Sequence, residues 1–453
     1  MAATGAAEHV LLPQHEPAKA PWTPRRIDMP HIQGLRLMAM VWIIAYHYLG
    51  HAPGSLLETF VNHRPLDLFT VISGFASHLA YGRRPTLGGP VAFLARRSSK
   101  VLFMYFLTLV LATALRLVQM ASPISDMPGT QRDYLRLLAS FLMALAGLNV
   151  WVFPLALVLT ADGWQCWPPN GPLWFVQSLI FCWFVYPLLR DRMCGEGWTR
   201  YKVLALMVAL GVLGIGMPAL LLRTVPYDQM WLVIKVCPVF MLPAFFLGVA
   251  ACELYLLELE HSENLARADV QDGSEDSCWA ATKRDWAGVL GELKLILFIC
   301  VQLEQYPSAQ RHTFSLLFGS ILYLLAVAAA LSSTHAYSLG VRWLLGLEWV
   351  VSLGDASLCA FTLQEPISVA LYWMVDGGAH VTDHMPFSWM PAQLFVAYIS
   401  LLYAIAVPVG LYVNTPASVW IQHQLMAAFP SIPRPSSPPP PVIASLTDPL
   451  PTR

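Results

Sequence analysis

The hydrophobic residues of this chain fall into long, nearly uninterrupted runs. A helix that crosses a lipid bilayer needs about 20 mainly apolar residues, and ten runs qualify, some of them at the short end. The pattern therefore predicts an all-α fold, a polytopic bundle of about ten transmembrane helices. The predicted spans are residues 35–49, 66–81, 101–120, 173–189, 203–222, 230–254, 289–303, 314–331, 349–375 and 392–413.

An eleventh apolar stretch, residues 135–160, is ambiguous. Lys and Arg are enriched in cytoplasmic loops, and basic clusters lie before the first span, between the second and third, and after the fourth. All three clusters lie on the cytoplasmic side only if residues 135–160 do not cross the membrane. We therefore expect a re-entrant or interfacial segment there, broken near Asn149 or Pro154, with both termini cytoplasmic. The pattern does not identify the membrane.

The apolar runs also divide the chain. Residues 1–30 form a polar N-terminal tail without the apolar core of a cleaved signal peptide, so the first run is interpreted as a signal anchor. Residues 31–413 form the predicted transmembrane domain, with a polar cytoplasmic loop at 256–287. Residues 430–453 are rich in Pro and Ser and are expected to be disordered.

Composition supports a membrane protein with no nucleic-acid partner. Hydrophobic residues make up 56% of the 453 residues and charged residues 12%, whereas soluble domains are about a quarter charged. The net charge of −1 gives no basis for binding nucleic acid. None of the eight Cys lies in a pair or cluster with zinc spacing, so no metal site is predicted.

Two ionisable residues in the first span lie on one helix face. Arg36 and His47 are eleven residues apart, which at 3.6 residues per turn is about three turns and about 16 Å of rise. Ionisable residues within a membrane span are functional candidates. An Arg at the cytoplasmic end suits the phosphates of coenzyme A, and a deep His suits proton transfer. The alternatives are an inside anchor for Arg36 and an interfacial position for His47.

The Arg, ten residues, then His pattern resembles the acyltransferase 3 family of membrane acyltransferases. Four further blocks support the resemblance. They are LDLFTVISGF (66–75), FLARRSSKVLFMYF (93–106), NGPLWFVQSLIFCWFVYPLL (170–189) and SLGDASLCAFTLQEPI (352–367), each similar in order and position to a family block.

Two positions depart from the family pattern. The Glu that follows the family's Trp-Ser-Leu motif is absent after Trp174, and the usual His of the late block is Gln364. Any role of those groups is lost or reassigned. The candidates to compensate are Gln177, Ser178, Gln364 and Glu365.

The resemblance, together with the chemistry and position of each residue, implies roles for particular residues. His47 is expected to be the general base, and Asp67, at the start of the second span, orients it or is simply a solvated charge at a helix start. Ser73 is expected to pack or to contact substrate rather than to act as a nucleophile, and Lys235 lines a cavity or snorkels to the interface. The residues expected to bind the substrates are Arg36, Arg96, Arg97, Lys100, Ser73, Trp174 and Gln364.

The resulting functional prediction is a membrane-bound O-acyltransferase. It moves an acyl group, expected to be acetyl, from acyl-CoA as co-substrate to a hydroxyl acceptor such as a carbohydrate or a lipid-linked glycan. No other cofactor is expected, and direct transfer and a transient acyl-His both remain open. The alternatives are a proton-coupled transporter or carrier, against which the lack of inverted repeats counts, and an inactive family member.

Overall fold

The computed structural model describes nine segments of the chain: residues 29–49, 65–83, 89–122, 129–160, 166–193, 197–221, 233–272, 341–376 and 390–428. The predicted spans 289–303 and 314–331 lie outside these segments, as do the terminal tails and residues 273–287 of the polar loop.

The described residues are almost entirely helical, as predicted. Their extended pairing is limited to one isolated bridge between Leu49 and Met390. The helices are α1 Pro30–Tyr48, α3 Pro65–Tyr81, α4 Gly89–Ala121, α5 Gln131–Leu145, α6 Asn149–Thr160, α7 Leu173–Met193, α8 Arg200–Leu221, α10 Pro238–Asp272, α14 Val341–Leu345, α15 Glu348–Asp355, α16 Ser357–Asp376, α17 Ala392–Pro408, the π-helix η4 Val409–Asn414 and α18 Thr415–Ala428.

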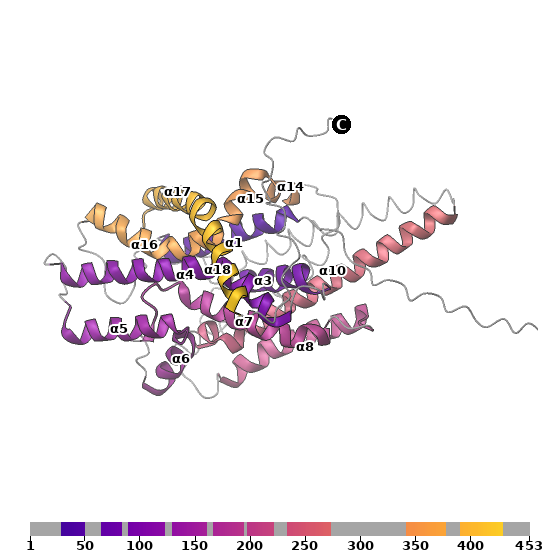
Figure 1. Cartoon of the computed structure of the whole chain (residues 1–453), viewed down its shortest axis with the longest axis horizontal. Coiled ribbons are helices and arrows are strands. Elements are labelled where there is room, and N and C mark those ends of the chain that lie inside the picture. Colours follow the sequence, from indigo (N-terminus) through magenta and orange to yellow (C-terminus); the bar gives the residue numbers. More distant parts are fainter. Residues whose placement is uncertain are drawn as a thin grey trace, which may run out of the picture.

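The long helices pack side by side into one bundle (Figure 1). Helix α3 packs along α10, and α4 contacts both α7 and α16. Helix α1 contacts α3, α14, α15, α16 and α17. Its start lies against α15, where Gln33 meets Gly354, and its end against α17, where Tyr48 packs on Tyr398. The C-terminal part of α10 extends beyond the rest of the bundle.

Five helical stretches within the described segments are long and apolar enough to cross a membrane. They are Gly89–Ala121, Leu173–Arg190, Pro238–His261, Ser357–Val375 and Ala392–Ala428. Helices α1, α3 and α8 also form over predicted spans. The number ten for the crossings stays a prediction.

Several predicted boundaries are wrong. Helix α4 begins twelve residues before the predicted span at Val101, so Arg96, Arg97 and Lys100 lie on a helix and not in a loop. Helix α10 continues to Asp272, so much of the predicted polar loop is helical. The predicted span 349–375 is divided at Ala356 between α15 and α16.

The ambiguous stretch 135–160 forms two short helices. The turn after α5 contains Gly147 with φ of 69°, a left-handed conformation that favours Gly. Asn149 begins α6, close to one predicted break, whereas Pro154 lies inside α6. Neither helix alone reaches the length of a span, and whether the segment is re-entrant stays a prediction.

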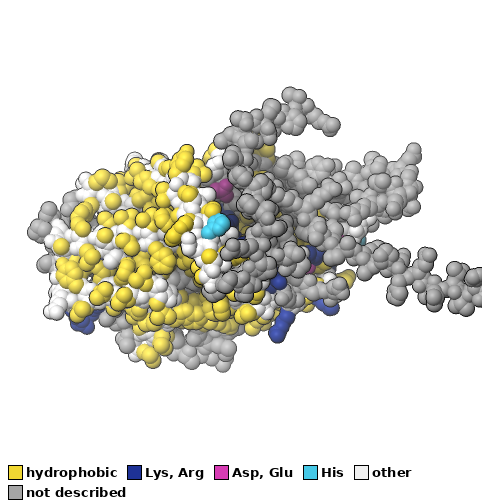
Figure 2. All heavy atoms as spheres, viewed as in Figure 1, with side chains coloured by type: hydrophobic (Ala, Val, Ile, Leu, Met, Phe, Trp, Pro, Cys, Tyr) yellow, Lys and Arg dark blue, Asp and Glu magenta, His cyan; other side chains and the backbone are white. Residues whose placement is uncertain are grey.

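Hydrophobic side chains cover much of the outer face of the bundle (Figure 2). Exposed examples occur on α4, α5, α8 and α17, among them Val110, Leu135, Val208 and Val396, each more than half exposed. Apolar surface of this extent indicates a membrane environment. Together with the span-length helices, it supports a multi-pass integral membrane protein.

The contact between α3 and α10 depends on two glycines. A Cβ atom on Gly74 would collide with the backbone carbonyl of Phe245, and one on Gly248 with the carbonyl of Val71. Small residues allow membrane helices to approach this closely. Gly74 and Gly248 therefore set the close approach of α3 and α10.

Candidate functional site

Helix α1 carries both Arg36 and His47 without interruption, as the spacing predicts. The side chain of Arg36 donates to Gln33 Oε1 over 2.9 Å. At the other end of α1, the Tyr48 carbonyl oxygen accepts a hydrogen bond from the backbone N–H of Met390, over 2.6 Å. Because the helix is continuous, the two side chains are separated by about 16 Å along its axis.

Arg36 belongs to a cluster of basic side chains, which we call the basic cluster: Arg36 on α1 with Arg97 and Lys100 on α4. These three residues are close enough to interact electrostatically with one another, and Asp355 at the end of α15 interacts with Arg36 and Lys100. Arg97 Nη2 donates to Ser77 Oγ over 2.9 Å, and its guanidinium carbon lies 5.7 Å from the centroid of the Tyr81 ring. The structure thus brings together three predicted donor-binding residues.

The basic cluster has more positive charge than its surroundings neutralise. None of its members makes an ion pair within 4.0 Å among the described residues, and Arg97 Nε is buried without a hydrogen-bond partner there. Other basic side chains of the described segments do make salt bridges: Arg83, Arg116, Arg136, Arg200 and Lys235. Arg36 and Arg97 are partly buried and Lys100 is exposed. Three positive charges that repel one another, with no carboxylate in salt-bridge range among the described residues, make the cluster suited to an anionic ligand.

Arg96, predicted to join the donor site, is partly buried on the same helix. Its carbonyl oxygen accepts from Ser99 Oγ over 3.2 Å. Its role stays a prediction.

The His47 end of α1 faces Gln364 on α16. The Gln364 amide lies within hydrogen-bonding reach of the imidazole, yet neither Oε1 nor Nε2 makes a hydrogen bond of ordinary geometry with a described residue. The residue is fully buried. The Tyr398 hydroxyl donates a hydrogen bond to the backbone carbonyl of Gln364 over 2.7 Å. The centroids of the Tyr398 and Tyr48 rings are 5.0 Å apart.

The carboxylate of Asp67 is held by Lys235. The ammonium group donates to Oδ1 over 3.0 Å and to Oδ2 over 2.9 Å. Lys235 lies just before the break at Pro238 that begins α10, and its side chain is 12% exposed. Lys235 therefore pairs with Asp67. Whether Lys235 lines a cavity or snorkels, and the orientation of His47 by Asp67, stay predictions.

Ser73 and Trp174 contribute to packing. Ser73 Oγ accepts from Trp183 Nε1 over 3.1 Å, and Ser73 is buried. This is the polar packing contact expected for a buried hydroxyl in a helix bundle. Trp174 packs its ring against Trp167 and Phe175. Their contacts with substrate stay predictions.

Three of the four compensating candidates already have partners. Gln177 Nε2 donates to Tyr105 Oη over 2.7 Å and to Asn149 Oδ1 over 3.2 Å, within a buried network between α4, α6 and α7. Ser178 Oγ donates to the Val236 carbonyl over 2.9 Å, and Glu365 is engaged in an ion pair described next. Gln364 alone among the four has a side chain without such bonds.

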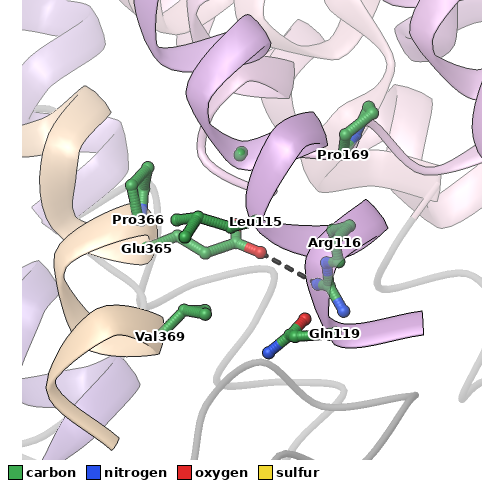
Figure 3. Close-up of a pocket in the computed structure, with 8 residues that line it drawn as sticks. Leu115, Arg116, Gln119, Pro169, Glu365, Pro366 and Val369 are labelled. Carbon is green, nitrogen blue, oxygen red and sulfur yellow. Dashed lines mark hydrogen bonds and ion pairs between the residues drawn. The ribbon is translucent and has the colours of Figure 1, made fainter. Parts of the chain in front are cut away.

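Glu365 joins α16 to α4 and to the turn before α7. Its Oε1 accepts from Arg116 Nη2 over 3.0 Å, and its Oε2 accepts from the backbone nitrogen of Gly171. The pair borders a shallow surface depression, which Gln119, Pro169 and Val369 also line (Figure 3). The Glu365 side chain is only 2% exposed, so the pair closes the interior at this end.

Replacing Arg116 with Met is expected to destabilise the protein by about 3–5 kcal/mol, because Glu365 would remain as a buried, unneutralised carboxylate. Thermal unfolding in detergent measures this. The matched control is Arg200→Met, which removes the more exposed pair with Glu258 and is expected to change stability by about 1 kcal/mol or less. Equal stability of both variants would contradict the role assigned to the Arg116–Glu365 pair.

Two features of this region were not anticipated from the sequence. No sequence motif assigns Asp355 to a site, but it interacts electrostatically with Arg36 and Lys100. His78 was not singled out, but it is fully buried and hydrogen-bonded to Tyr186 and Glu253. A His three residues before the end of a predicted span was the available signal. No group of His, Cys, Asp and Glu residues with the geometry of a metal site occurs in the described part of the chain.

A comparison with protein families identifies the family of this chain. A family model described as an acyltransferase domain matches residues 29–412. The chain belongs to the acyltransferase 3 family. No match was found among curated proteins or solved structures.

Membership in the acyltransferase 3 family indicates acyltransferase activity. The match begins at the residue before α1 and ends within η4, so it includes the basic cluster, His47 and Gln364. The family also agrees with the multi-pass membrane character of the helices. The donor, the acyl group and the acceptor are not defined by membership.

Proposed function

We propose that this acyltransferase moves an acyl group, most simply acetyl, from acyl-CoA to a hydroxyl group of a carbohydrate or a lipid-linked glycan. The observation that carries this proposal is the basic cluster. Arg36, Arg97 and Lys100 converge without ion-pair partners among the described residues. Coenzyme A has clustered phosphates, which charge-assisted donors of this kind bind well.

The donor would lie along α1 with its phosphates in the basic cluster and its thioester toward His47. The axial separation of about 16 Å between Arg36 and His47 suits the extended pantetheine arm of coenzyme A. Lys100 is exposed, so the cluster is accessible from its own end of the bundle. In this arrangement the Arg36 end of the helix face binds the phosphates, and the His47 end catalyses acyl transfer.

His47 acts as the general base in this scheme. The acceptor oxygen attacks the thioester carbonyl carbon, a C–O bond forms and the C–S bond breaks. The hydroxyl proton passes to the imidazole and then to the departing thiolate. Neither oxidant nor metal is needed, and the products are an ester and coenzyme A.

Gln364 is the residue best suited to assist His47. Its amide is buried and within reach of the imidazole, but it lacks hydrogen bonds of ordinary geometry. An amide in this position supplies both a donor and an acceptor to a reacting group. A buried polar group without a partner is unfavourable unless a ligand satisfies it, which favours contact with the acyl carbonyl or the acceptor hydroxyl.

The test is the release of coenzyme A by purified protein given acetyl-CoA and a panel of hydroxyl acceptors. The proposal predicts acceptor-dependent release of coenzyme A and an equal amount of esterified acceptor. Uptake of acyl-CoA or acceptor into vesicles without ester formation would instead indicate a transporter. Neither ester formation nor transport with any donor or acceptor would indicate an inactive family member.

A further inference from the structure

A chain of buried and partly buried hydrogen bonds lies next to the basic cluster and outside the proposed reaction path. His78 Nδ1 is 3.1 Å from Tyr186 Oη, and His78 Nε2 is 2.9 Å from Glu253 Oε2. Arg83 Nη2 donates to Glu253 Oε1 over 2.7 Å and Arg83 Nη1 donates to Glu260 Oε2 over 2.8 Å. We call these five residues the His78 network.

The His78 network ties three helices together. His78 lies on α3, Tyr186 on α7, and Glu253 and Glu260 on α10. A neutral imidazole satisfies the geometry, because Nε2–H donates to the carboxylate while Nδ1 accepts from the tyrosine hydroxyl. His78 and Tyr186 are fully buried and Glu253 is 3% exposed, so these bonds replace water that the interior excludes.

The last turns of α3 contact the side chain of Arg97, the member of the basic cluster that lies on α4. Ser77, next to His78, accepts from Arg97 Nη2 over 2.9 Å, and the Tyr81 ring lies 5.7 Å from the Arg97 guanidinium carbon. Ser77 and Tyr81 are four residues apart and therefore share one face of α3. Tyr186 also interacts electrostatically with Arg97.

The geometry points to the His78 network as a positioning device for the donor site. By fixing the end of α3 against α7 and α10, it fixes Ser77 and Tyr81, and through them the guanidinium group of Arg97. His78 is thus a positioning residue for binding of the donor's phosphates and takes no part in proton transfer to the substrate. This inference rests on the proposed function, since it assumes an acyl-CoA phosphate at Arg97.

The test compares the affinity of the intact, detergent-purified protein for coenzyme A and its KM for acetyl-CoA across matched variants. His78→Leu removes both hydrogen bonds of the imidazole and is expected to weaken coenzyme A binding and to raise the donor KM about tenfold, with a much smaller change in kcat. His78→Gln keeps an amide donor for Glu253 and is expected to recover part of the affinity. Tyr186→Phe removes only the hydroxyl and provides a milder variant if His78→Leu does not fold.

A double-mutant cycle with Arg97→Ala separates positioning from general stability. If His78 acts through Arg97, His78→Leu will change coenzyme A affinity little in the Arg97→Ala background. An equal loss of affinity in both backgrounds, or a loss of kcat with unchanged affinity, would overturn the inference. Binding of coenzyme A is measured without turnover, so these outcomes remain distinct from a failure of the acyl-transfer proposal, which would leave coenzyme A binding without ester formation.

Discussion

His47→Ala is expected to lower kcat for acyl transfer by about 10²–10⁴-fold, the range that loss of a general base produces. Binding of coenzyme A at the basic cluster is expected to change little, because Arg36 lies about 16 Å away along α1. The measurement is coenzyme A release under saturating acetyl-CoA and acceptor. His47→Gln, which keeps a polar side chain but no base, is expected to be as inactive as His47→Ala.

The matched control for His47 is His423→Ala. His423 lies on α18 and is exposed, so its removal is expected to leave kcat and the elution profile of the purified protein unchanged. Wild-type kcat in folded His47→Ala protein would remove His47 from the mechanism.

Arg97→Ala is expected to raise the KM for acetyl-CoA by about 10- to 100-fold, because a charge-assisted contact to phosphate contributes about 1.5–3 kcal/mol. The kcat at saturating donor is expected to fall much less. The KM of the wild type is expected to rise with salt concentration, since ions screen the cluster, and that dependence is expected to weaken in the variant. Steady-state kinetics at several ionic strengths measure both effects.

Arg200→Ala is the control for Arg97→Ala. Arg200 is paired with Glu258 over 2.7 Å at the start of α8, outside the basic cluster. Its removal is expected to leave the donor KM unchanged. A similar increase in KM for both variants would mean that Arg97 acts through net charge and not through a specific contact.

The fold class and the placement of Arg36 and His47 on one helix face were predictable from the sequence, because each depends on local periodicity. Uninterrupted apolar runs predict helices, and the eleven-residue spacing of Arg36 and His47 predicts one shared face, which the continuous helix α1 provides. Boundaries were less predictable. The basic residues before Val101 were interpreted as a loop, yet they lie on α4, since Lys and Arg are compatible with a helix that extends beyond the apolar region.

The pairing of polar groups could not be predicted, because it depends on contacts between distant segments. On sequence grounds Asp67 either orients His47 or is a solvated charge at a helix start, and the structure pairs it with Lys235. Likewise, four candidates could compensate for the two missing family groups, and only the tertiary contacts distinguish Gln364 from Gln177, Ser178 and Glu365.

The central claim is that acyl-CoA binds along α1 from the basic cluster to His47. An experimental structure of the protein with bound coenzyme A tests this most directly. The account predicts the phosphates in contact with Arg36, Arg97 and Lys100 and the sulfur atom beside His47 and Gln364. Phosphates bound elsewhere, or a sulfur atom far from His47, would contradict it.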